Sequence, residues 1–180
     1  HPPIWVAAVS PETFARFGRM GYPFLSSPNF TPLQYVKEQY ASYREEYLAA
    51  GHPPAQLELP LLQQVYVAPT AERARQEPER YAMWYFRTLA EVAASPGQAP
   101  ADYRFYGKIA DRLRSVGYDE IYEHGATFGT PESCVERIQM YQQEIGLNYF
   151  LCWMNFGGLP HAQVRAAMRL FAEKVMPAFR

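Results

Sequence analysis

Two hydroxyl residues near the start of the sequence, Ser10 and Thr13, have a spacing that could hold an anion. Ser10 is a favoured N-cap, Pro11 suits the first position of a helix, and Glu12 complements the positive end of the helix dipole. A phosphate group could bind the free N–H groups and the two hydroxyls of such a helix start. The same residues also fit a plain N-capped helix, which on these residues alone is the more common explanation.

An apolar run leads directly into this turn. The residues from Ile4 to Val9 show no polar alternation, which predicts a strand covered on both faces, as in a parallel sheet. Ser10 then ends the strand. The two hydroxyls are therefore expected at the carboxyl end of a buried strand.

Strand, turn and helix recur about four times along the chain. Further strands are predicted over 22–25, 61–68 and 148–155, and the tyrosine stripe of the helix after Pro32 is interpreted as core packing. A long helix starts at Glu72, and Pro78 is expected to interrupt or restart it. Thr130-Pro131-Glu132-Ser133 repeats the pattern of the first turn. Short connections of this kind place helices beside parallel strands.

The predicted fold is therefore α/β, as a single domain over residues 1–180. A (β/α)8 barrel needs about 250 residues, so four units amount to roughly half of one. Either a first half precedes His1, or the exposed strand edges pair with another copy or with a partner. The segment 93–125 is too long for a plain connection and is interpreted as either a mobile lid or a decorative surface loop.

Composition and charge exclude several classes of function. A net charge of −1 without a Lys/Arg run argues against nucleic acid as a partner. No apolar stretch approaches the roughly 18 residues of a membrane span, and no leader opens the chain. Cys134 and Cys152 lack a CxxC spacing, and the four histidines have no metal or triad spacing. A cytoplasmic protein without a metal site is expected.

Three stretches resemble the family of bacterial luciferase. The turn from Phe128 to Cys134, the strand 146–155 and the ending 168–177 resemble its carboxyl end, and the opening from Trp5 to Ser27 resembles its middle. The match is collinear over essentially the whole chain. The resemblance implies a luciferase-like, flavin-dependent monooxygenase with a (β/α)8 barrel, of which this chain supplies strands five to eight.

The resemblance also implies a cofactor and partners. Reduced flavin mononucleotide (FMN), supplied by a separate reductase, and O2 would oxidise an aldehyde or a similar apolar substrate. Ser10 and Thr13 fall on the family's phosphate-binding hydroxyl positions, which raises the phosphate interpretation above the plain N-cap. Val9 stands where luciferases often have a carboxylate, and Ser27 where they have a tryptophan beside the flavin ring.

Other site residues follow from the same resemblance. The segment 93–125 stands in the place of the family's lid, with Lys108 and Arg112 as candidates to approach the flavin. Trp84 lines the pocket by this alignment, or else it is a core tryptophan. The family's catalytic histidine lies in the first half of the barrel, outside this sequence. The catalytic residues are therefore unknown, and the 180 residues alone are expected to be inactive.

Two other functions remain open. Barrels of this superfamily also use the deazaflavin coenzyme F420 for hydride transfer. A non-catalytic flavin-binding relative with a shortened barrel would bind the cofactor without oxidising a substrate.

Overall fold

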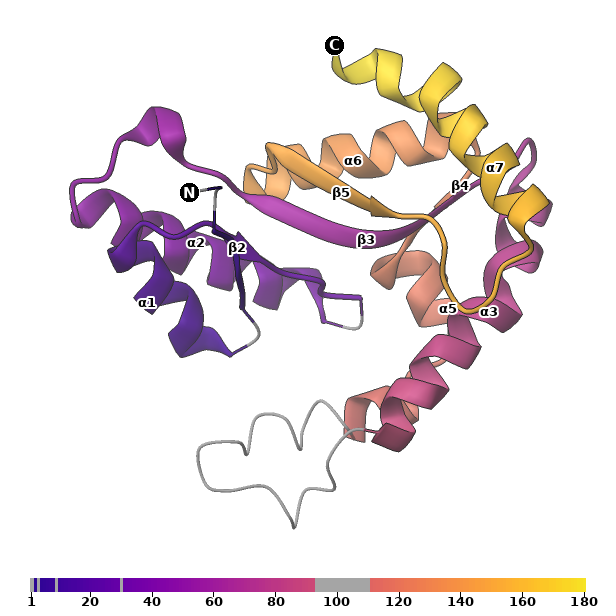
Figure 1. Ribbon diagram of the computed structural model, residues 1–180, viewed down its shortest axis with the longest axis horizontal. Helices are drawn as coiled ribbons and strands as arrows, with labels where there is room; N and C mark the ends of the chain where they lie inside the picture. Colours follow the sequence, from indigo (N-terminus) through magenta and orange to yellow (C-terminus); the bar gives the residue numbers. More distant parts are fainter. Residues whose placement is uncertain (1, 3, 9, 30, 93–110) are drawn as a thin grey trace. The chain divides into compact units, whose positions relative to one another are not determined.

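The chain is an α/β protein with parallel strand pairs (Figure 1). The computed structural model describes residues 2, 4–8, 10–29, 31–92 and 111–180. These form two compact units, one of His1–Gln63 with Glu136–Cys152 and one of Gln64–Val135 with Trp153–Arg180. Each helix in the described ranges is too short or too polar to cross a membrane.

The first unit begins with two short strands joined by a helix. β1 (Val6–Ala7) pairs in parallel with β2 (Phe24–Leu25), and α1 (Pro11–Met20) connects them. The expected strand 4–9 is thus shorter than predicted. The prediction that this strand is buried on both faces is wrong as well, because Ile4 is 50% exposed and Ala7 is exposed. Among the described residues β1 pairs along one edge only, and a two-stranded ribbon cannot cover both of its faces.

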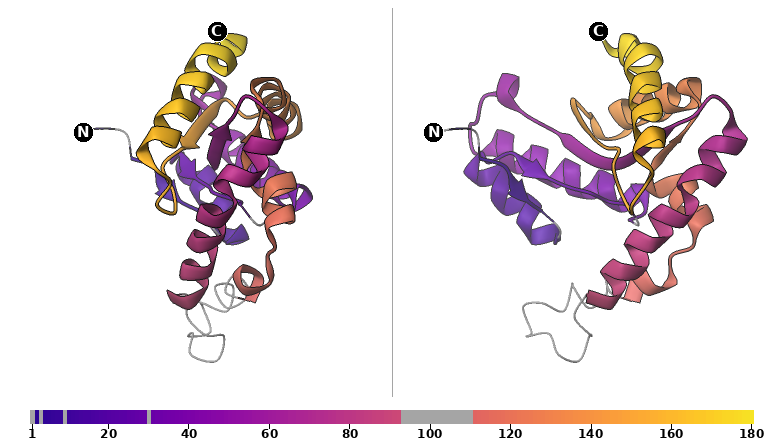
Figure 2. Two further views of the ribbon diagram at one scale, coloured as in Figure 1. Left: turned by 90° about the vertical axis from the view of Figure 1, so that its right-hand side faces the viewer. Right: turned by 45° about the vertical axis from the view of Figure 1, so that its right-hand side comes forward.

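α1 and α2 (Leu33–Ala49) pack against each other, as the right view of Figure 2 shows. Gly18 allows this approach, because a Cβ at that position would lie 2.5 Å from the carbonyl oxygen of Tyr43. Tyr40 and Tyr43 are each 1% exposed, and their rings pack edge-on against Phe24. The prediction that the tyrosine stripe is core packing is confirmed.

β3 (Pro60–Val67) is the longest strand and follows the 3-10 turn η1 (Pro54–Gln56). Nearly all of its residues are buried, so the prediction of a buried strand over 61–68 is confirmed within one residue at each end. α3 (Ala71–Val92) follows as one continuous helix, which both views of Figure 2 show. The expected interruption at Pro78 is wrong: the proline lies inside the helix and is buried there.

The second half of the chain contains one strand more than predicted. Residues 111–115 are helical and lead to α5 (Tyr118–Glu120) and the π-helical turn η3 (Ile121–Gly125). β4 (Thr127–Gly129) pairs in parallel with the end of β3, in the register Val65↔Thr127. The sequence analysis read this stretch only as a turn, because three residues are too few to show a period.

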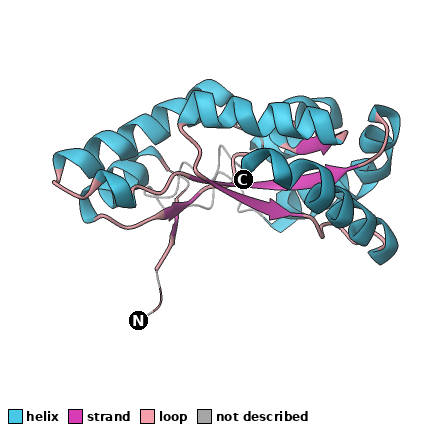
Figure 3. Cartoon of the chain, turned by 90° about the horizontal axis from the view of Figure 1, so that it is seen from above, coloured by secondary structure: helices cyan, strands magenta, loops and turns pink. Residues whose placement is uncertain are grey.

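The last elements follow the predicted order. α6 (Pro131–Ile145) precedes β5 (Tyr149–Trp153), which is shorter than the expected strand 148–155. α7 (His161–Leu170) continues into the π-helical turn η4 (Phe171–Val175) and the 3-10 turn η5 (Met176–Phe179). β3 lies between β4 and β5 in a three-stranded sheet. Helices make up most of the described chain (Figure 3).

Candidate functional site

The first turn of α1 presents a pair of hydroxyls. Ser10 has the extended backbone of an N-cap, but its side chain makes no capping hydrogen bond. Its Oγ atom instead lies 2.7 Å from the Oγ1 atom of Thr13. Both residues are partly exposed. A free anion could therefore accept hydrogen bonds from these hydroxyls at the positive end of the α1 dipole.

Two other helices, α3 and α6, begin with the same pattern of residues as α1 but have a side-chain cap. At α3 the backbone N–H of Arg73 donates to Thr70 Oγ1 over 3.3 Å, and at α6 the N–H of Ser133 donates to Thr130 Oγ1 over 3.4 Å. These two threonines therefore cap their own helices. Ser10 alone of these three leaves the first-turn N–H groups without a side-chain acceptor.

The end of β2 adds polar groups in the same unit. Ser26 and Asn29 are buried, and Asn29 Nδ2 donates to Ser27 Oγ over 3.0 Å. Asn29 Oδ1 is buried without a hydrogen-bond partner among the described residues. Ala8 N–H donates to Leu25 O, so the carboxyl ends of β1 and β2 lie beside each other. Ser27, at the position where the resemblance places a tryptophan beside the flavin ring, is exposed.

Two of the expected site residues, Val9 and Lys108, lie outside the described residues, as does segment 93–110 of the expected lid. Arg112 lies on the helical stretch 111–115 and forms an ion pair with Glu120. Its guanidinium would have to leave or share this carboxylate to reach another anion.

Trp84 is 58% exposed on α3, so it is not a core tryptophan of the described chain. The ring of its neighbour Tyr85 lies 4.7 Å from that of Trp153 in an edge-on contact. The Phe156 ring contacts Trp153 and stacks on Phe128 at 5.5 Å. Burial raises the pKa of the Tyr85 phenol. These rings form an aromatic cluster at β4 and the carboxyl end of β5, and Tyr85 contributes to it.

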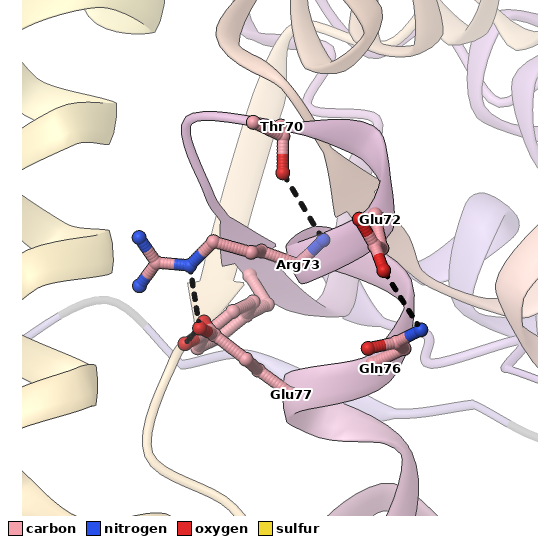
Figure 4. A network of polar contacts seen from close by, with 6 residues as sticks. Thr70, Glu72, Arg73, Gln76 and Glu77 are labelled. Atoms are coloured by element: carbon pink, nitrogen blue, oxygen red, sulfur yellow. Dashed lines mark hydrogen bonds and ion pairs between the residues drawn. The ribbon is translucent and has the colours of Figure 1, made fainter.

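A second polar network lies at the start of α3, where Figure 4 shows Arg73 reaching Glu77. Arg73 Nε donates to Glu77 Oε1 over 2.7 Å, and Tyr66 OH donates to Glu77 Oε2 over 2.5 Å. Burial, and then the Glu77 carboxylate, raise the pKa of the Tyr66 phenol well above its usual value. A hollow of about 270 Å³ beside this network is also lined by Arg169 and Glu173. Two cations and two anions balance there, so the hollow favours neither sign of charge.

This network was not predicted from the sequence, although one pattern indicates where it begins. Thr70-Ala71-Glu72-Arg73 follows the same order of hydroxyl, small residue, glutamate and polar residue as the turns at Ser10 and Thr130. Tyr66 and Glu77 belong to different elements, and nothing in their spacing indicates a contact. Among the described residues no group of three or more His, Cys, Asp or Glu side chains could hold a metal ion.

The fold and these turns define an α/β protein in which parallel strands lead into helices that start with hydroxyl residues. Residues 1–148 match the luciferase-like monooxygenases, and the chain belongs to that family. The resemblance noted in the sequence is confirmed. No curated protein matches the chain.

Three solved structures of similar fold are about twice as long as this chain. Monooxygenase RslO1 from Streptomyces bottropensis is 24% identical with a TM-score of 0.71, over 100% of this chain and 49% of its own. The oxygenating constituent of 3,6-diketocamphane monooxygenase of Pseudomonas putida, solved with FMN, is 18% identical with a TM-score of 0.71, over 98% of this chain and 49% of its own. An F420-dependent secondary alcohol dehydrogenase, in complex with an F420-acetone adduct, is 18% identical with a TM-score of 0.67, over 100% of this chain and 49% of its own. At these identities the likeness establishes the fold alone, and the chain spans about half the length of each of the three.

Proposed function

We propose that this chain is the flavin-binding second half of a luciferase-like, flavin-dependent monooxygenase. It would use reduced FMN and O2 to oxidise an aldehyde or a similar apolar substrate. The family membership supports this proposal, and so does the 49% share of the RslO1 chain that this chain covers. The remaining barrel strands would come from an N-terminal half or from self-association, and the reduced flavin from a separate reductase.

The strand neighbours fit four consecutive strands of a (β/α)8 barrel. β1 pairs with β2. The Leu62 N–H of β3 donates to the carbonyl oxygen of Ser26, which directly follows β2, over 2.9 Å, and β3 neighbours β5. In this proposal β1, β2, β3 and β5 are barrel strands five to eight. β4 is then an additional short strand of the segment between β3 and β5, and 93–125 is the lid, with Lys108 and Arg112 as its cationic residues.

The observation that carries the proposal is the pair of hydroxyls at the start of α1. Ser10 and Thr13 are bonded to each other and not to the helix backbone, unlike Thr70 and Thr130. These two hydroxyls and the N–H groups of the α1 turn would hold the phosphate of FMN. Val9 supplies no side-chain hydrogen bond at this turn, so the hydroxyls carry more of the binding. Trp84 is proposed as a pocket residue, on the alignment and its exposure.

Reduced FMN, when bound, supplies the electrons that activate O2. The chain's own part is to bind the phosphate, orient the cofactor and keep water from it. No base for the reaction is assigned here, since the family's catalytic histidine belongs to the first half of the barrel. The 180 residues alone are therefore expected to bind FMN weakly and not to turn over.

Comparison of FMN with riboflavin tests the proposal. The two ligands differ only in the phosphate, and hydrogen bonds to a charged group contribute about 1.5–3 kcal/mol each. FMN should therefore bind the chain about tenfold or more tightly, which a titration of flavin fluorescence measures. Equal affinities would contradict a phosphate site.

A second candidate keeps the fold and changes the cofactor. The likeness to the F420-dependent secondary alcohol dehydrogenase favours coenzyme F420 and hydride transfer. The absorption spectrum of the cofactor that co-purifies with the protein in its natural length separates the two cofactors. Flavin that remains bound without oxygen-dependent loss of any aldehyde would instead favour a non-catalytic flavin-binding relative.

A further inference from the structure

A hollow of about 570 Å³ lies in the first unit, away from the hydroxyls of α1. Its lining residues Pro23, Leu57 and Tyr149 stand at the amino ends of β2, β3 and β5. Ser10 follows the carboxyl end of β1, at the other end of the parallel strands. The volume is in the range of small-molecule sites. This hollow is therefore distinct from the proposed phosphate site.

The hollow carries one negative charge. Glu58 is the only Asp, Glu, Lys, Arg or His among the described residues that line it. Its Oε2 atom is buried and has no hydrogen-bond partner in the described part of the chain. A buried carboxylate oxygen without a partner is unfavourable, and a positive charge held in the hollow would stabilise the Glu58 carboxylate.

Two other polar side chains of the wall are already engaged. Asn148 Oδ1 accepts from Leu59 N–H, and Asn148 Nδ2 donates to Leu57 O, each over 2.7 Å. Tyr47 OH donates to Pro53 O over 3.2 Å. These bonds fix the wall around Glu58. Among the described lining residues, Glu58 is the one with a buried side-chain oxygen that has no hydrogen-bond partner.

Two aromatic rings complete the lining. Tyr149 is 49% exposed, and the ring of Trp5 supports it in an edge-on contact at 5.0 Å. Tyr47 is buried, and the negative charge of Glu58, after burial itself, raises the pKa of its phenol. Aromatic faces together with a carboxylate are the combination that proteins use for ammonium groups. A metal ion would find too few oxygen ligands, because one carboxylate does not make a coordination shell.

We propose that this hollow binds a small organic cation, with the ammonium group paired to Glu58 and its alkyl groups against Tyr149 and Tyr47. The site is independent of the flavin and needs no part of the segment 93–110. An anion would be repelled by Glu58, and a neutral ligand would leave the buried oxygen uncompensated.

The probes are tetramethylammonium chloride and butylammonium chloride. Their binding is measured by the changes in backbone amide chemical shifts in NMR. Saturable shifts should concentrate at 57–58 and 148–149, whereas the α1 turn at Ser10 should not respond. Sodium chloride at equal concentration corrects for ionic strength. Shifts spread over the surface, or equal shifts with sodium acetate, would overturn the proposal.

Glu58→Gln removes the charge with little change of shape and should weaken the binding of either cation about tenfold or more. Glu45→Gln is the matched control: it makes the same charge change at an exposed position of α2 that does not line the hollow, and affinity should stay within about twofold. Tyr149→Leu, whose ring is half-exposed, tests the wall without removing a buried group. Unchanged affinity in Glu58→Gln would refute the site, whatever Tyr149→Leu does.

Discussion

The Oγ atom of Ser10 and the Oγ1 atom of Thr13 lie 2.7 Å apart and share one hydrogen bond, which leaves one hydroxyl proton for an external acceptor. In the turns before α3 and α6 the corresponding hydroxyl accepts a backbone N–H of its own helix, and at α6 Thr130 Oγ1 also donates to Ser133 Oγ over 3.4 Å. One pattern of residues therefore has two structural outcomes. At α3 and α6 the hydroxyl caps the helix. At α1 the positive end of the helix stays open to an external acceptor.

The double variant Ser10→Ala with Thr13→Ala should weaken FMN by about tenfold or more and leave riboflavin nearly unchanged. The lost hydrogen bonds go to the phosphate, which riboflavin lacks. Titrations of flavin fluorescence with both ligands measure the ratio. Thr130→Ala with Ser133→Ala changes the equivalent turn of α6 and is the matched control. A proportional loss of both ligands in the first variant would count against the phosphate assignment.

The same contrast predicts stability. Thr70→Ala and Thr130→Ala each remove a cap and should lower the free energy of unfolding by about 1 kcal/mol. Ser10→Ala should cost clearly less, because Ser10 makes no capping bond. Urea denaturation of the three variants gives the order. If Ser10→Ala proved the most costly of the three, the hydroxyl would be capping α1 in solution.

The periodicity of the sequence predicted the helices of the first unit and the strand β3 well. Tyr40 and Tyr43 recur at helical spacing and are buried as expected, because their stripe is wide enough to define one face. The prediction was wrong at Pro78. The low helix propensity of proline argued for a break there, but α3 continues through Pro78, which is buried. Tertiary packing decides whether a helix continues through such a residue, and it overrides the propensity of a single residue.

The candidate site was less predictable than the fold. The Ser10 and Thr13 spacing indicated the turn, but whether the hydroxyls cap the helix depends on side-chain torsions that the sequence does not encode locally. The contact between Tyr66 and Glu77 joins a strand to a helix, and the Tyr85 and Trp153 contact joins two distant elements. Pairings of that kind arise only from the packed fold. Lys108 and Val9 lie outside the described residues, so their roles stay predictions.

Gly157 and Gly158 offer a second matched pair of substitutions. Both have left-handed backbones, with φ of 57° and 78°, which cost an alanine about 1–2 kcal/mol. A Cβ at Gly157 would also lie 1.9 Å from the carbonyl oxygen of Tyr81, whereas a Cβ at Gly158 meets open space. Gly157→Ala should therefore lower the free energy of unfolding by about 3 kcal/mol or more, and Gly158→Ala by only the backbone cost. Denaturant titrations compare them, and equal losses would show that the loop can move away from α3.

Buried tyrosines should make the protein unstable in alkali. Burial raises the pKa of Tyr43 to about 12, and burial also raises the pKa of Tyr40, whose hydroxyl donates to Pro60 O, well above its usual value. In the unfolded chain these phenols ionise near pH 10. A raised pKa in the folded state means that the stability is fully present below about pH 10 and is lost as the pH rises towards 12 and beyond.

Tyrosine absorbance at 295 nm, followed together with circular dichroism, tests this alkaline transition. The buried phenols should ionise in the same pH range in which the helices unfold, and Tyr40→Phe should flatten the fall in stability above pH 10, since the variant loses one buried phenol that the folded state keeps protonated. Its loss of the hydrogen bond to Pro60 O lowers stability at every pH, so the slope and not the absolute stability is the diagnostic quantity. Complete ionisation of all the tyrosines while the circular dichroism is unchanged would mean that the phenols of α2 reach water in the folded protein, which is incompatible with the tyrosine core between α1 and α2.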